Sequence, residues 1–132
     1  MNRKKILIVE DEESLLKLES ILLSSKGYAV NGVMDGKAAL EAVAANRPDL
    51  IILDIMLPGI DGFEVCRRIK ENSDTAGIPV LMLTAKKNSQ DMERGRQVGC
   101  DVYMTKPFKS AKVLDMVQEL LSREREPGEP VA

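Results

Sequence analysis

Short apolar runs alternate along the chain with longer segments in which apolar residues recur at helical spacing. Five of the short runs are rich in β-branched and aliphatic residues, which is typical of strands. They are residues 6–9, 29–33, 50–53, 80–83 and 102–104. The first, third and fourth runs are almost continuously apolar, as expected for strands covered on both faces. We therefore predict five strands, with these three at the centre of one sheet.

The segments between the strands predict helices. Residues 13–25 place Leu15, Leu18 and Leu22 at helical spacing, and Gly27 follows as a typical C-terminal stop. Two acidic residues stand where helix N-caps are expected: Asp35 and Asp61. A last helix begins near residue 110 and carries the clearest apolar stripe: Val113, Leu114, Val117, Leu120 and Leu121. Strand and helix thus alternate five times.

This alternation predicts an α/β fold, in which a doubly wound, five-stranded parallel sheet is covered by helices on both faces. In such sheets ligands bind beyond the carboxyl ends of the strands, at the point where the strand order reverses. The residues that follow the strands are therefore the candidates for a functional site.

The fourth predicted helix, residues 89–98, is the weakest. Its large apolar residues are only Met92 and Val98, and Gly95 in its interior costs about 1 kcal/mol relative to alanine. We expect a marginally stable, mobile helix.

Length, composition and charge limit the domain organisation and the location. The 132 residues, 44% of them apolar, fit one domain, which we predict over residues 1–123, followed by a charged, proline-broken tail or linker stub over residues 124–132. The N-terminal apolar stretch is too short for a signal peptide, and no span of about 20 apolar residues exists, so we expect a cytoplasmic protein without membrane contact. A net charge of −2 provides no basic field, so we expect no direct nucleic acid binding.

The chain contains no histidine and two isolated cysteines, Cys66 and Cys100. The missing imidazole excludes histidine metal ligands, Ser-His and Cys-His nucleophile pairs, and phosphohistidine within this chain. The cysteines form no CxxC motif and are interpreted as reduced, structural thiols. Any chemistry must then use carboxylates, lysine and hydroxyl groups.

Charged and hydroxyl residues stand at the carboxyl ends of the predicted strands. They are Glu10 and Asp11 after the first strand, Asp54 after the third, Thr84 after the fourth and Lys106 after the fifth. Each alone is an ordinary helix cap, strand end or surface charge. Asp54 is more unusual, because it interrupts the apolar run 50–57, where an unpaired buried carboxylate would cost several kcal/mol. Since the ends of parallel strands meet at one edge, we expect these residues to converge on one crevice.

Three carboxylates in one crevice repel one another and favour a bound cation. At about 4 Å each like-charge pair costs roughly 1 kcal/mol in water and about 4 kcal/mol at an effective dielectric of 20. Oxygen ligands without histidine or cysteine favour a hard ion, Mg²⁺ or Mn²⁺. Such an ion beside a lysine is suited to phosphoryl transfer, and Asp54 is the candidate acceptor, forming an aspartyl phosphate.

These residues resemble the receiver domain of two-component response regulators. The resemblance runs from Lys4 to Ser122, and four segments carry it in the family's order and spacing: ILIVEDE, LIILDIMLPGIDG, VLMLTA and GCDVYMTKPF. It implies a flavodoxin-like strand order of 2-1-3-4-5. It also implies a phosphorelay signalling domain that catalyses its own phosphorylation and dephosphorylation, rather than an enzyme acting on a free substrate.

The resemblance also implies roles for single residues. Asp54 would take the phosphoryl group from a histidine of a sensor kinase or phosphotransfer protein. Mg²⁺ would be bound directly by Asp11, Asp54 and the backbone carbonyl of Met56, and through water by Glu10. Lys106 and Thr84 would contact the phosphoryl oxygens, and Tyr103 would act as an aromatic switch. The Lys106-Pro107 bond would be cis, and an output partner, whose identity remains open, would bind the fourth helix, fifth strand and fifth helix.

The sequence departs from the family pattern at several positions. Glu10 replaces the commoner Asp, which predicts altered metal affinity rather than its loss. The winged-helix transcription regulators of the family dimerise through an acid, an Arg and an Asp at positions that are Lys112, Met116 and Val102 here. Their absence argues against a fragment of that subfamily.

Two alternatives stay open. The chain is either a complete receiver or the receiver part of a longer regulator or hybrid kinase. A less favoured alternative is a Mg²⁺-dependent phosphohydrolase with an aspartyl nucleophile, although Met56 stands where enzymes of the haloacid dehalogenase type have their general acid. Flavin binding is weaker still, because the acidic pair after the first strand would repel phosphate.

Overall fold

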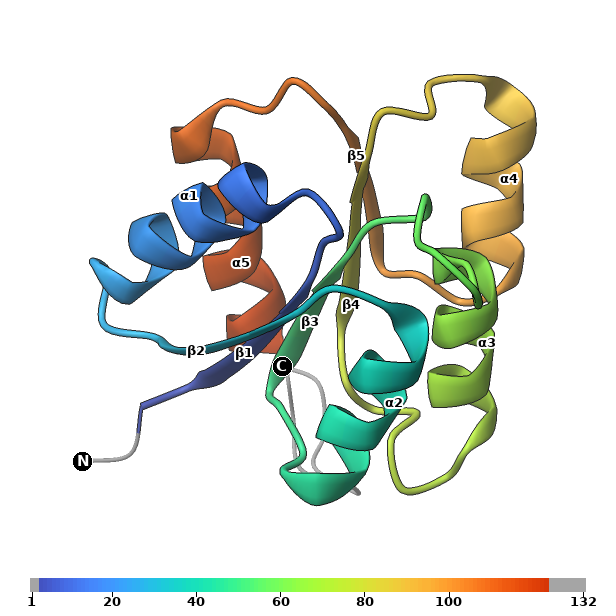
Figure 1. Cartoon of the computed structure of the whole chain (residues 1–132), viewed down its shortest axis with the longest axis horizontal. Helices are drawn as coiled ribbons and strands as arrows, with labels where there is room; N and C mark the ends of the chain where they lie inside the picture. Colours follow the sequence, from blue (N-terminus) through green and yellow to red (C-terminus); the bar gives the residue numbers. More distant parts are fainter. Residues whose placement is uncertain (1–2, 124–132) are drawn as a thin grey trace.

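The computed structural model describes residues 3–123, and strands and helices alternate through them as predicted (Figure 1). The strands are β1 (Lys5–Val9), β2 (Ala29–Val33), β3 (Leu50–Leu53), β4 (Val80–Thr84) and β5 (Val102–Thr105). The helices are α1 (Glu13–Ser24), α2 (Gly36–Ala45), α3 (Gly62–Glu71), α4 (Ser89–Gln97) and α5 (Ser110–Arg123). The predicted tail, residues 124–132, lies outside the described residues.

The five strands form one parallel sheet in the order β2-β1-β3-β4-β5. This is the predicted doubly wound fold with its flavodoxin-like order. The order reverses between β1 and β3, which are neighbours in the sheet although β2 lies between them in the chain. The point where the strand order reverses therefore lies beside the ends of β1 and β3.

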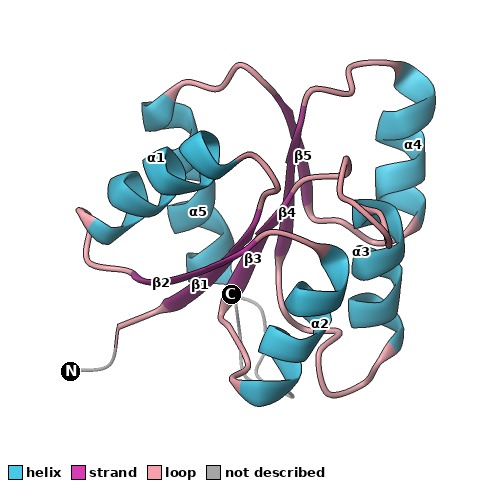
Figure 2. Cartoon of the chain, in the orientation of Figure 1, coloured by secondary structure: helices cyan, strands magenta, loops and turns pink. Residues whose placement is uncertain are grey.

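Helices cover both faces of the sheet, with α1 and α5 on one face and α2, α3 and α4 on the other (Figure 2). Because successive side chains of a strand point to opposite faces, β1 contributes Leu7 and Val9 to one core and Ile6 and Ile8 to the other. Every residue of β3 and β4 is buried, as expected for central strands. Two layers of apolar side chains thus hold the sheet rigidly beneath its strand ends.

The predicted helix signals operate as expected. The Asp35 side chain accepts a hydrogen bond from the amide of Ala38 at 2.7 Å, and Asp61 accepts one from the amide of Glu64 at 3.0 Å. Each caps the first turn of its helix. Gly27, the predicted stop after α1, adopts a left-handed φ of 92°.

Helix α1 is turned differently from the predicted stripe. Leu18 is 53% exposed and Ile21 is 64% exposed, whereas Glu19 and Leu23 are the buried residues of the helix. Leu16 packs over β2, where its Cδ1 lies 2.8 Å from the position that a Cβ on Gly32 would take. Close approach over this glycine sets the inner face along Leu16, Glu19 and Leu23, and it leaves Leu18 on the outside.

Helix α4 contacts the rest of the molecule over a small area. Gly95 is its one buried residue, and a Cβ there would lie 2.9 Å from the Tyr103 ring and 3.2 Å from the Met82 sulfur. The glycine that weakens the helix therefore also allows its close packing. The predicted mobility of α4 stays a prediction.

Two further observations bear on the sequence analysis. Both cysteines are free, and burial raises the pKa of Cys66 to about 12 and that of Cys100 to about 11, which keeps both as thiols. Among residues 3–123, no helix has the length and apolar character needed to cross a membrane.

Candidate functional site

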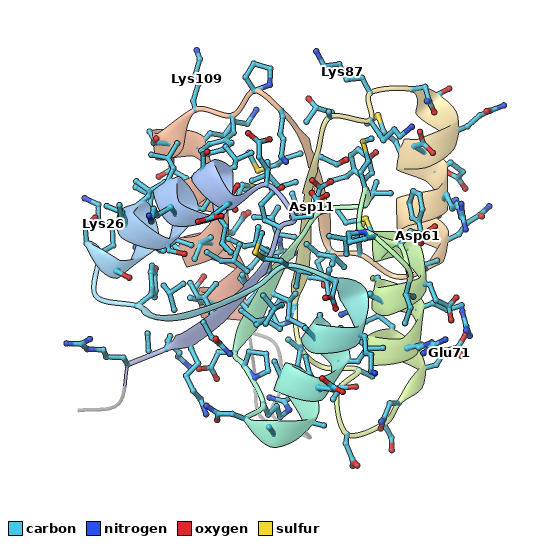
Figure 3. All side chains as sticks on the ribbon, viewed as in Figure 1. Asp11, Lys26, Asp61, Glu71, Lys87 and Lys109 are labelled. Atoms are coloured by element: carbon cyan, nitrogen blue, oxygen red, sulfur yellow. The ribbon has the colours of Figure 1, made fainter. Side chains whose placement is uncertain are left out.

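Three carboxylates meet at the carboxyl ends of β1 and β3. One oxygen from each of Glu10, Asp11 and Asp54 lies within 4.8 Å of the other two. Glu10 is 2% exposed and Asp54 is 6% exposed, whereas Asp11 faces solvent. Figure 3 shows Asp11 at the edge of the sheet, between the helices of the two faces. The structure thus brings together the acidic residues that the sequence placed at the strand ends.

The sheet itself positions these carboxylates. Val9 pairs with Leu53, and the amide of Asp54 donates to the carbonyl of Val9 at 3.1 Å, so the two strands end side by side. The start of α3 also packs closely against the backbone of Asp54, since a Cβ on Gly62 would lie 2.2 Å from the Asp54 carbonyl oxygen. Only glycine permits that approach, which restrains the backbone on both sides of Asp54.

Lys106 joins the two buried carboxylates. Its Nζ donates to Oε1 of Glu10 at 2.7 Å and to Oδ2 of Asp54 at 2.9 Å. The lysine follows β5, and its bond to Pro107 is cis, as the resemblance implied. A cation from the far edge of the sheet therefore neutralises part of the charge of the cluster.

Burial and pairing act on the ionisation of this group in opposite directions. Burial disfavours the charged form of Lys106, but hydrogen bonds to Glu10 and Asp54 outweigh it, so the pKa of Lys106 is raised. Burial also raises the pKa of Glu10, and the hydrogen bonds from Lys106 and from the amide of Glu12 oppose that rise. Lys106 therefore stays positively charged at neutral pH.

Both oxygens of Asp54 have a partner in the described residues. Oδ2 accepts from Lys106, and Oδ1 accepts from the backbone amide of Met56 at 3.1 Å. The Met56 side chain itself is 52% exposed. The carboxylate is thus held in one orientation at the rim of the sheet, which explains how Asp54 is tolerated inside an apolar run.

Thr84 and Tyr103 meet at the backbone of Lys86. Thr84 is fully buried, and its Oγ1 accepts from the amide of Lys86 at 3.3 Å. The Tyr103 hydroxyl donates to the carbonyl of Lys86 at 2.8 Å. Burial, followed by nearby negative charge, raises the pKa of Tyr103 to about 12, so the hydroxyl keeps its proton. Through this one residue the loop after β4 is joined to both predicted switch residues.

A cleft of about 560 Å³ opens beside the carboxylates, between the loop after β3 and helix α4. Asp11, Met56 and Lys86 line the end next to the site, and Arg94 lines the end next to α4. The Arg94 guanidinium lies 4.4 Å from the centre of the Phe63 ring. The cleft connects the carboxylates to α4, in which Gly95 is the one buried residue.

The donor set suits a hard divalent cation. The converging atoms are carboxylate oxygens, and one of the three carboxylates is open to solvent, so that an ion could keep several waters. Lys106 compensates one negative charge and leaves the cluster acidic. The residues therefore fit Mg²⁺, while the cysteines lie elsewhere in the core.

Two features of the structure, one in the site and one on α1, were not predicted from the sequence. The backbone of Lys86 is one, because backbone partners leave no signal in residue type. The other is Glu19, a carboxyl group buried on the inner face of α1. Its spacing of three and four residues from Leu16 and Leu23 was visible, but a glutamate beside the stripe of Leu15, Leu18 and Leu22 is normally exposed.

Comparison with known sequences identifies a family over most of the chain. The family model described as response regulator receiver domain matches residues 6–118. DNA-binding response regulator MtrA of Mycolicibacterium smegmatis is 42% identical over 128 residues, which cover 96% of this chain and 55% of that protein. The alkaline phosphatase synthesis transcriptional regulatory protein PhoP of Bacillus subtilis is 44% identical over 120 residues, covering 91% of this chain and 49% of PhoP. The chain spans about half the length of the curated relatives it matches.

Comparison with solved structures agrees with this. The signal receiver domain of a signal transduction histidine kinase from Syntrophus aciditrophicus superposes with a TM-score of 0.87 at 35% identity, and the match covers 98% of each chain. Similar domains therefore occur both in transcriptional regulators and in a kinase.

Proposed function

Since the chain belongs to the response regulator receiver domain family of two-component systems, we propose that Asp54 accepts a phosphoryl group from a histidine of a sensor kinase or phosphotransfer protein. The proposed domain spans residues 1–123 and acts in the cytoplasm as a signalling module, not as an enzyme on a free metabolite. The observation that carries this proposal is the convergence of Glu10, Asp11 and Asp54 around Lys106.

The chemistry assigned to the residues follows from their contacts. A carboxylate oxygen of Asp54 attacks phosphorus, a P–O bond forms, and the bond from phosphorus to the donor nitrogen breaks. Lys106 would then move its hydrogen bond from the Asp54 carboxylate to a phosphoryl oxygen, and the Thr84 hydroxyl would donate to another. Asp54 is fit for this role because its backbone is held by β1 and Gly62.

Mg²⁺ is the proposed cofactor. Asp11, Asp54 and the Met56 carbonyl would hold it directly and Glu10 through water, as the family resemblance implies. When bound, the ion neutralises charge that develops on the transferring phosphoryl group. Glu10 and Asp54 would share Lys106 between them when the ion is absent.

The proposed output is a change in the face formed by α4, β5 and α5. Two new charge-assisted hydrogen bonds, to Lys106 and Thr84, contribute about 1.5–3 kcal/mol each if they form only in the active state. Reversing a population from 1:99 to 99:1 requires about 5.5 kcal/mol. One phosphoryl group therefore supplies nearly the whole free energy of a switch, which Tyr103 and the Lys86 loop would relay to α4.

Phosphorylation from a small-molecule donor tests the proposal. We expect the chain, incubated with acetyl phosphate and Mg²⁺, to gain the mass of one phosphoryl group, and Asp54→Asn to gain none. Asp74→Asn, which changes an exposed aspartate in another loop, is the matched control and should behave like the wild type. An equal yield from Asp54→Asn would overturn the proposal, and turnover of a phosphate ester without a stable adduct would favour the phosphohydrolase alternative.

A second proposal concerns the protein to which the domain belongs. We propose that it works as the receiver part of a longer protein, because the curated relatives are about twice as long as the matched region. Those relatives are DNA-binding or transcriptional regulators, but Lys112, Met116 and Val102 depart from the dimer residues of the winged-helix subfamily, so the proposal does not extend to that subfamily. DNA contact would then belong to a segment outside this chain. Sequencing the gene beyond the codon for Ala132 tests it, and an immediate stop codon would contradict it.

A further inference from the structure

Glu19 is a buried carboxyl group that the proposed function does not use. It is 2% exposed, and its Oε2 has no hydrogen-bond partner among the described residues. An unpaired buried polar group costs free energy, and a buried charge without a partner costs more. A residue of this kind calls for a physical explanation.

Glu19 lies close enough to the carboxylate cluster for the charges of its residues to act on it. It lies on the inner face of α1 between Leu16 and Leu23, and α1 begins directly after the acidic residues that follow β1. Three charged groups act on it electrostatically: Glu10 after β1, Asp54 after β3 and Lys106 after β5. On the same face of the sheet, Leu23 belongs to a core cluster with residues of β1, β3, β4 and α5, and Leu16 and Tyr28 pack against it.

These surroundings decide the charge of Glu19. Burial, assisted by the negative charge of Glu10, raises the pKa of Glu19 to about 8. The group is therefore mostly protonated at pH 7 and becomes charged within one to two pH units above it. Lys106 and Tyr103 keep their protons over the same range, because the pKa of Lys106 is raised and that of Tyr103 is about 12.

We propose that Glu19 is a proton-carrying residue near the site, which releases its proton when a divalent cation binds to the carboxylates of Glu10, Asp11 and Asp54. The inference rests on the proposed function, because it requires that the cluster binds Mg²⁺. The step balances: the neutral carboxyl loses H⁺ to solvent, and the resulting carboxylate faces two additional positive charges at the cluster.

Reciprocity then links metal affinity to pH. If bound Mg²⁺ favours the ionised form of Glu19, ionised Glu19 must favour bound Mg²⁺ by the same factor. Affinity for Mg²⁺ therefore rises as the pH passes through the titration of Glu19. Ionisation of Glu10 also strengthens Mg²⁺ binding as the pH rises. The contribution of Glu19 to this pH dependence is therefore the part that is lost when Glu19 alone is replaced.

The test is an NMR titration with MgCl₂ of the full chain at pH 6.5 and pH 9, in which amide shifts near Asp11 report the Kd. We expect the wild-type Kd to fall by about fivefold more between these pH values than the Kd of Glu19→Gln. Glutamine keeps the shape of the side chain but cannot titrate. Glu41→Gln, an exposed glutamate on α2 across the sheet, is the matched control and should keep the wild-type dependence.

A second measurement does not depend on the variant. The ¹³C shift of the Glu19 side-chain carboxyl, followed against pH in the wild type, should show its titration at lower pH with saturating MgCl₂ than without. Equal pH dependence of the Kd in wild type and Glu19→Gln, or an unchanged Glu19 titration, overturns this inference alone. Absence of saturable Mg²⁺ binding at either pH overturns it together with the proposed cofactor.

Discussion

Lys106 is the residue on which the charge balance of the site depends. It is the cation that contacts both Glu10 and Asp54, and each contact is shorter than 3 Å. A neutral residue here would leave the developing charge of the phosphoryl group without its lysine donor. The consequences for phosphorylation should therefore exceed those for folding.

We predict that Lys106→Met phosphorylates about 100-fold more slowly with acetyl phosphate at saturating Mg²⁺, a magnitude typical of losing one preorganised donor. The initial rate of mass gain measures this. Lys112→Met, on the exposed side of α5, serves as the control and should keep the wild-type rate. A Lys106→Met rate within twofold of wild type would show that the lysine is only structural.

A second prediction at the residue scale concerns Glu19 and the pH dependence of the free energy of unfolding. Its pKa is raised from 4.5 to about 8 on folding, so the folded state binds more protons than the unfolded state between these values. The stability contributed by its protonated form is complete below about pH 4.5 and is lost as the pH rises through 8. The free energy of unfolding of Glu19→Gln, relative to that of wild type, should therefore rise by on the order of 3 to 5 kcal/mol from pH 5 to pH 9. Urea unfolding at the two pH values measures the difference, and a constant difference would contradict the buried, protonated state.

Helix α1 shows at the scale of the element how packing overrides a sequence pattern. Leu18 and Ile21 are exposed and Leu15 and Leu22 are partly exposed, whereas Glu19 is buried. An apolar stripe on the outside of a helix contributes little to folding, because it gains little burial.

Leu18 and Leu23 therefore form a matched pair of substitutions in one helix. We expect Leu23→Ala to lower the free energy of unfolding by about 2 to 5 kcal/mol, because it leaves a cavity in a fully buried position. Leu18→Ala should change it by less than about 1 kcal/mol. Chemical denaturation measures both changes. Similar losses of unfolding free energy for the two variants would mean that α1 buries the stripe of Leu15, Leu18 and Leu22 instead.

A second prediction at the scale of the element concerns local opening of helix α4. Its Ser89–Gln97 segment buries only Gly95, so few apolar contacts oppose local opening. We predict that hydrogen exchange of α4 amides is faster than that of α3 and α5 amides, and that phosphorylation changes it more than it changes α3. Exchange measured by mass spectrometry with and without acetyl phosphate tests this, with Asp54→Asn as the control. Uniform exchange across the three helices would argue against α4 as the moving element.

At the scale of the whole molecule, two apolar cores enclose one sheet, and three carboxylates meet at one edge of it. Repulsion among the three carboxylates opposes folding in the absence of a cation. A cation that binds only the folded chain should therefore stabilise the entire domain.

Mg²⁺ at 100 times its Kd is predicted to add about 2.7 kcal/mol to the free energy of unfolding and to raise Tm by roughly 10 °C. Differential scanning calorimetry measures this, and excess EDTA should reverse it. Without Mg²⁺, Asp11→Asn should be more stable than wild type, because it relieves repulsion between carboxylates. Adding Mg²⁺ should then raise the stability of this variant less than it raises that of wild type. A Tm that does not respond to Mg²⁺ in either protein would count against the metal site.

Much of this molecule was predictable because its signals are local. Strand runs, caps at Asp35 and Asp61, and the stop at Gly27 depend on neighbours within a few residues, and the structure agrees with each. The meeting of Glu10, Asp11 and Asp54 was also predictable, because parallel topology brings strand ends to one edge. The orientation of α1 was not, since it depends on Leu16 resting over Gly32 in another element.

The sequence alone determined the α/β class, the strands, most helix boundaries and which acidic, hydroxyl and basic side chains stand at the strand ends, because each follows from periodicity and chain order. Only the tertiary structure decided that Lys106 pairs with both Glu10 and Asp54, and that the Lys86 backbone joins Thr84 to Tyr103. It also decided that Glu19 is buried and that its Oε2 has no hydrogen-bond partner within residues 3–123. These last features depend on distances between elements far apart in the chain, and such distances are set by packing rather than by local residue preference.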